Sequence, residues 1–146
     1  MKLEIELVPK SSWYSNVRSN ISKEEWDILR KASYRKAGHL CEICGGKGDK
    51  HPVECHEIWE YDDNRNIQKL IGFIALCPDC HQIKHIGLAR IKGNFEKAKK
   101  HLMKINKISE EKADEYIEEV FEKWVKRSKE EWNIDLKFLN NLTTKK

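Results

Sequence analysis

The stretch Leu76-Cys77-Pro78-Asp79-Cys80-His81-Gln82-Ile83-Lys84-His85 decides how this chain folds, because it gathers two cysteines and two histidines. A second Cys-x-x-Cys pair stands upstream, with 32 residues between the two pairs. Zinc prefers four thiolate or imidazole ligands in a tetrahedron, and each short Cys-x-x-Cys turn points two sulfurs at one ion. We therefore predict a structural Zn²⁺ site whose ligands are Cys41, Cys44, Cys77 and Cys80.

Two other interpretations of the cysteines are a redox-active pair and inert buried thiols. A redox Cys-x-x-Cys normally stands alone near a strand-to-helix junction of a parallel fold, and the βαβ pattern of such a fold is missing from this chain. Cys55 is left over. No signal peptide is apparent at the N-terminus, so we expect reduced thiols and a cytoplasmic chain.

Hydrophobic periodicity predicts an α+β fold around this motif. Residues 52–61 and 70–76 read as two strands joined by a polar turn, and 3–7 as a short strand that pairs with residues 132–139. Helices are expected over 22–37, 81–91 and 95–105, and after a cap at Ser109. We divide the chain into an N-terminal strand and helix arm (1–38), a zinc-stapled module (39–92) and a C-terminal helical extension (93–146).

Three histidines accompany the cysteines. His56 lies in the middle of the first predicted hairpin strand, and His81 and His85 follow the second cysteine pair. On a helix, residues four apart share one face, so these two imidazoles can bind one cation. The remaining histidines, His39, His51 and His101, we interpret as surface or structural residues.

From Cys41 to His85 the order of these residues resembles the HNH family of nucleases with zinc-binding knuckles. The resemblance implies a ββα-metal (treble-clef-like) module with flanking helices that hydrolyses DNA. It implies that His56 is the general base on the attacking water. It also implies that His81 and His85 bind a catalytic Mg²⁺, Mn²⁺ or other divalent cation.

The chain departs from the family pattern at two positions. Cys55 stands where the family has a further metal ligand, and Gly72 falls near the place of the family's middle Asn. In an alternative register, His56 is a metal ligand and Glu57 is the base. We favour His56 as base because an imidazole titrates near neutrality, whereas a carboxylate needs a raised pKa.

The distribution of charge favours a nucleic-acid partner. Residues 81–107 hold eight basic residues against one acidic residue, whereas 109–131 hold nine acidic against five basic ones. A basic stretch after a metal motif suits phosphate contact, although a solvated helix face has the same composition. The predicted DNA-contacting residues are Lys84, Arg90, Lys92, Lys97, Lys99 and Lys100.

Composition narrows the function classes. The chain of 146 residues is 36% charged, and no apolar run approaches the roughly 20 residues of a membrane span, so we expect no membrane partner. A metal-dependent DNA endonuclease is the function we predict. The rival is a catalytically silent zinc module that binds nucleic acid or a protein partner.

Overall fold

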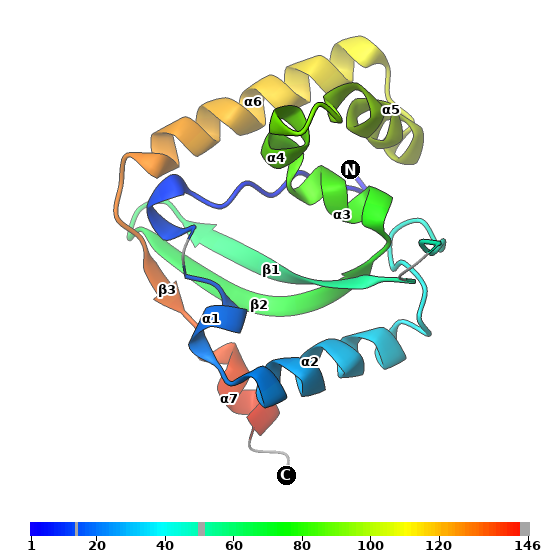
Figure 1. Cartoon of the computed structure of the whole chain (residues 1–146). Coiled ribbons are helices and arrows are strands. Elements are labelled where there is room, and N and C mark those ends of the chain that lie inside the picture. The colour runs from blue at the N-terminus through cyan, green and yellow to red at the C-terminus, as the bar shows by residue number, and fades with distance from the viewer. Residues whose placement is uncertain (14, 50–51, 144–146) are drawn as a thin grey trace.

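The fold is α+β, as predicted, in a computed structural model that describes residues 1–13, 15–49 and 52–143 (Figure 1). In chain order the elements are η1 (Lys10–Ser12), α1 (Val17–Asn20), α2 (Lys23–Lys36), β1 (Glu54–Asp62), β2 (Ile67–Leu76), α3 (Pro78–Lys84), α4 (Ile86–Ile91), α5 (Phe95–Asn106), α6 (Glu110–Ser128), β3 (Asn133–Asp135) and α7 (Phe138–Thr143).

The predicted hairpin is present as the antiparallel pair β1 and β2. Its register runs from Glu54 opposite Leu76 to Asp62 opposite Ile67, with an irregularity between Ile58 and Trp59. The turn between the strands is stabilised by the Asp62 carboxylate, which accepts hydrogen bonds from two backbone amides of the turn. The strand β2 begins three residues earlier than predicted, because the turn is shorter than its polar sequence indicates.

The prediction that the N-terminus forms a strand is wrong. Residues 3–7 are extended but join no sheet, and the third strand β3 instead pairs in parallel with β2. Side chains satisfy the backbone of the N-terminal segment: the Asn106 amide exchanges two hydrogen bonds with Leu3, each of 2.8 Å. The Tyr116 hydroxyl accepts from the Ile5 amide at 2.8 Å. Alternation in this segment therefore reflects burial against helices.

Two of the predicted helices have the caps that the sequence indicates. Ser22 caps α2 in a capping box with Glu25, and Ser109 caps α6. The single helix expected over 81–91 is divided, because the backbone of His85 adopts φ −116° and ψ 46° between α3 and α4. The two histidines of this region therefore do not lie on one continuous helix.

The sheet separates two layers of helices (Figure 1). Helices α3 to α6 and the N-terminal segment lie over one face, where the larger core contains buried Leu3, Leu76, Ile83 and Leu102. Helices α1, α2 and α7 lie on the other side, where a smaller core is built around Trp59. Helix α3 follows the hairpin directly, so the cysteine and histidine side chains at its start lie next to β1 and β2.

Candidate metal centres

The four predicted zinc ligands lie together between the loop at residues 41–46 and the start of α3. Their sulfur atoms are all within 4.8 Å of one another, and Cys44 Sγ is 3.6 Å from Cys77 Sγ. A zinc–sulfur bond of about 2.3 Å gives tetrahedral edges of about 3.8 Å, so the spacing fits one zinc ion. All the cysteines are free thiols. The chain therefore contains a four-cysteine cluster beside a β-hairpin, compatible with structural Zn²⁺.

Backbone geometry aims the cysteine side chains at one point. The Gly45 amide donates to the Cys41 carbonyl at 2.9 Å, and Gly45 has φ 76°, a conformation that glycine adopts without a steric penalty. The amides of Gly46 and Cys80 point at the sulfurs of Cys44 and Cys77, at 3.4 and 3.5 Å. Such amide dipoles stabilise thiolate charge.

The sulfur atoms of the cluster also influence one another's protonation. A hydrogen bond with Cys80 lowers the pKa of Cys41 to about 4, and the same hydrogen bond raises the pKa of Cys80. Burial raises the pKa of Cys77 to about 11. Thiolates so close together repel one another. A bound divalent cation would offset that repulsion and would displace the remaining thiol protons.

His101, which we interpreted from the sequence as a surface or structural residue, lies next to the four-cysteine cluster. Its Nε2 lies 3.2 Å from Cys80 Sγ, which suits a hydrogen bond to a metal-bound sulfur. The residue comes from α5, and no spacing signal connects it to the cysteines. His39 is exposed, and His51 falls outside the described residues.

Cys55 does not belong to the four-cysteine cluster. Its thiol is half-buried near Ser33 of α2, and burial raises its pKa to about 11. Burial raises the pKa of Cys77 equally, so it is the position of Cys55 beside α2 that keeps its thiol out of the cluster.

The three predicted histidines form a second cluster between β1 and α3. Their ring centroids are 4.9 to 5.3 Å apart, and one nitrogen from each ring lies within 4.8 Å of the others. His81 Nε2 lies 3.3 Å from His85 Nε2. The His85 imidazole lies against His81 although the helix is broken at His85. These three rings could bind a cation.

Two glutamates that the sequence did not reveal complete the imidazole cluster. Glu54 Oε2 is 2.6 Å from His81 Nδ1, so a carboxylate fixes one ring nitrogen and leaves the other to face the cluster. Glu6 Oε2 from the N-terminal segment is 3.5 Å from His56 Nε2. That contact lies within ion-pair range, but it is too poorly aligned for a hydrogen bond.

The His56 imidazole is only 6% exposed, and its Nε2 has no hydrogen-bond partner among the described residues. Buried polar atoms are normally satisfied, so an unmatched nitrogen on a ring that packs against two other imidazoles is a place for a water or ion. Burial lowers the pKa of His81 and lowers that of His85 to about 4. Neutral imidazoles are the form that binds metals.

Glu57 lies away from the imidazole cluster. Successive residues of a strand point to opposite faces, and the Glu57 carboxylate accepts a hydrogen bond from the Val17 amide at 3.2 Å. Burial raises its pKa to about 7. A proton-accepting group of suitable pKa is thus present at Glu57, but it faces α1.

The six predicted DNA-contacting residues do not form one uniform surface. Lys99 is buried and forms ion pairs with Glu110 and Asp114, each at 3.1 Å. The Arg90 guanidinium stacks between Phe95 and Phe121. The others, which form no ion pair within the described part of the chain, are Lys84, Lys92, Lys97 and Lys100.

Comparison of the chain with known protein families, curated proteins and solved structures finds no match. Among the described residues, no helix is both long and apolar enough to cross a membrane. The function of the chain is therefore inferred from the geometry of the two clusters.

Proposed function

We propose that this protein is a metal-dependent endonuclease of the HNH type, which hydrolyses phosphodiester bonds of DNA. The observation that carries the proposal is the convergence of His56 from the hairpin with His81 and His85, directly after the four-cysteine cluster. In this proposal the hairpin and α3 form a ββα-metal module. The cysteines hold a structural zinc that fixes α3 against the hairpin.

The imidazole cluster offers the two groups that phosphodiester hydrolysis needs. His81 and His85 would hold a divalent cation, which stabilises charge on the phosphorane and on the leaving oxygen. Glu54 orients His81 for this role. The four-thiolate site has no free position for substrate, so its role is structural.

His56 is the group we assign as general base. A neutral imidazole can remove a proton from an attacking water, and the His56 ring packs against the rings of His81 and His85. The resulting imidazolium would be stabilised by the Glu6 carboxylate 3.5 Å away.

A second candidate function is a zinc module that binds nucleic acid or a protein without cleaving it. Two observations favour it: Cys55, which stands where the HNH family has a further metal ligand, has its thiol near α2, and Gly72, opposite Ile58, falls near the place of that family's Asn. This candidate keeps the zinc site and gives the imidazoles no catalytic role.

Relaxation of supercoiled plasmid separates the two functions. Zinc-loaded protein, dialysed free of other divalent cations, should leave the plasmid intact and should nick it when Mg²⁺ or Mn²⁺ is added. A chelator added afterwards should stop the reaction. If the plasmid stays supercoiled with every divalent cation tried, while zinc remains bound, the second candidate replaces the first.

A further inference from the structure

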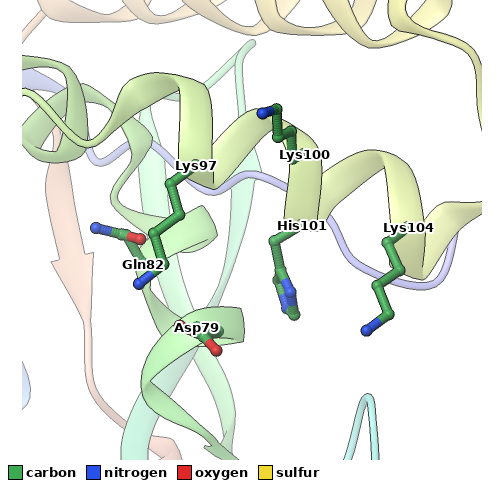
Figure 2. Close-up of a pocket in the computed structure, with 6 residues that line it drawn as sticks. All are labelled: Asp79, Gln82, Lys97, Lys100, His101 and Lys104. Carbon is green, nitrogen blue, oxygen red and sulfur yellow. The ribbon is translucent and has the colours of Figure 1, made fainter.

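A pocket of about 220 Å³ lies between α3 and α5 (Figure 2). Its α3 side consists of Asp79 and Gln82, which are three residues apart and share one helix face. At 3.6 residues per turn, this face lies roughly 130° around the helix from His81. The pocket is therefore separate from the imidazole cluster, although both involve α3.

The α5 side of the pocket is basic. Lys97, His101 and Lys104 project from one face of α5 toward α3, whereas the Lys100 side chain points the other way (Figure 2). Within the described part of the chain, Lys97 and Lys104 form no ion pair, in contrast to the neighbouring Lys99.

The opposing charge in the pocket is small. Asp79 is the one carboxylate among the lining residues, and it lies in the first turn of α3, where the helix dipole favours an acidic side chain. The Gln82 amide can donate a hydrogen bond to an anion. The volume corresponds to several water molecules, since one takes about 30 Å³ in the liquid, so there is room for a hydrated phosphate group.

We propose that this pocket binds a non-reacting phosphate of the DNA backbone, an inference that rests on the proposed nuclease function. Lysine ammonium groups bind phosphate as mobile point charges, which suits an open pocket. The pocket and the imidazole cluster lie on different faces of α3, and a helix with its side chains is about 10 Å across. Grooves of B-DNA are about 6 and 12 Å wide, so a duplex with one phosphate at the imidazoles brings another within reach of the pocket.

A different role for the same lysines is to offset the charge of the zinc site. Four thiolates around Zn²⁺ carry a net charge of −2, and His101 connects the pocket to Cys80. In that case removal of the lysines would weaken zinc retention and leave DNA affinity unchanged. The two roles therefore give opposite results in one experiment.

The test variant is Lys97→Gln with Lys104→Gln, and the matched control is Lys112→Gln with Lys126→Gln, a pair of exposed lysines on α6. Binding of a short fluorescein-labelled DNA duplex is measured by anisotropy over a salt series, without added divalent cation. The slope of log K against log salt should become shallower by about 0.9 for each phosphate that the variant no longer neutralises. The control should keep more of the parent slope.

Zinc release to a chromogenic chelator is followed in the same variants. The inference is supported if the pocket variant has the shallower slope and retains zinc at the parent rate. It is overturned if the slope falls equally in both variants, if it falls in neither, or if the pocket variant releases zinc faster with unchanged DNA binding. Because binding is measured without a catalytic cation, failure of the cleavage proposal would leave this result interpretable.

Discussion

His56 and Glu57 are neighbours in the chain, yet β1 points their side chains to opposite faces of the sheet. His56 meets two other imidazoles, whereas the Glu57 carboxylate accepts from the Val17 amide. The alternative register, in which Glu57 is the base, would need its carboxylate to cross the strand. The assignment of His56 as base thus rests on strand geometry, which places its ring against the other two imidazoles.

Metal titration distinguishes a base from a ligand. We predict that His85→Ala weakens Mn²⁺ binding strongly, because His81 and His85 present nitrogens only 3.3 Å apart. His56→Ala should leave the Mn²⁺ affinity nearly unchanged. Calorimetric titration of the zinc-loaded variants measures both. Loss of Mn²⁺ binding in His56→Ala would make His56 a third ligand.

Glu57 should make stability depend on pH. Burial raises its folded pKa to about 7 from a usual value near 4.5, so the folded state holds a proton that the unfolded state releases. The stabilisation is complete below about pH 4.5 and is lost as the pH rises to about 7, by at most roughly 3 kcal/mol.

The parent should therefore lose stability as the pH rises from 5 to 8, whereas Glu57→Gln, which has no carboxyl group at this position, should not. The stability of the variant relative to the parent should thus be higher at pH 8 than at pH 5. Urea unfolding of both zinc-loaded proteins at these two values measures the difference. A stability difference that does not change with pH would show that the Glu57 carboxylate is not titrating in this range. The variant should also still nick plasmid, because its side chain faces away from the imidazoles.

Residue types and spacing predicted much of both clusters. Two Cys-x-x-Cys pairs and the His81 to His85 interval each carry a local signal, because their ligands are close in sequence. Glu6 and His101 carry none, since tertiary packing brings them from 50 and 21 residues away to His56 and Cys80. Glu54 shares a strand face with His56, a signal that alternation alone could have supplied.

At the scale of the elements, the N-terminal segment shows how burial can imitate a strand. Residues 3–7 alternate because Leu3 and Ile5 are buried against helices, while their backbone groups pair with side chains. Caps are more reliable indicators of structure, as at Ser22 and Ser109, because a cap is satisfied by residues three positions away. Pairing between distant segments has no comparable local signature.

The side-chain pairing of this segment can be tested at Asn106. We predict that Asn106→Ala destabilises the protein by about 1–3 kcal/mol, because it leaves the Leu3 amide and carbonyl without partners. Asn94→Ala, at the other end of α5, removes an amide that makes no cap hydrogen bond and should cost less.

Hydrogen exchange at the Leu3 amide reports the local effect of the same change. It should become faster in Asn106→Ala and remain slow in Asn94→Ala. Equal destabilisation by the two variants would contradict the role of Asn106 as the anchor of the segment. This segment also contains Glu6, whose carboxylate is 3.5 Å from His56 Nε2, so loosening the segment should also move Glu6 away from His56.

On the scale of the whole molecule, residues 77–85 join the two clusters through one short helix. Cys77 and Cys80 lie at the start of α3, and His81 and His85 follow within the same stretch. Zinc binding would therefore determine where the imidazoles lie, and metal and fold are linked. The larger hydrophobic core lies between the sheet and helices α3 to α6, so packing stabilises the hairpin in addition to any bound zinc.

Cysteine substitutions test this link in a way that burial alone would not predict. Cys44 is exposed and Cys55 is half-buried, so packing predicts that Cys55→Ala is the more damaging change. We predict the opposite: Cys44→Ala should lose bound zinc and lower Tm strongly, while Cys55→Ala keeps one zinc per chain. Native mass spectrometry and thermal unfolding measure both effects. A Cys44→Ala protein that is zinc-free yet as stable as the parent would contradict the structural role of the metal.

If the imidazole cluster cleaves DNA with His56 as base, the rate of plasmid nicking by His56→Ala reports it most directly. At saturating Mn²⁺, with zinc bound and DNA affinity matched to the parent, the rate should fall about 10²- to 10⁴-fold, the usual contribution of a general base. A rate equal to that of the parent would show that His56 takes no part in the reaction and that the imidazole cluster does not act as proposed.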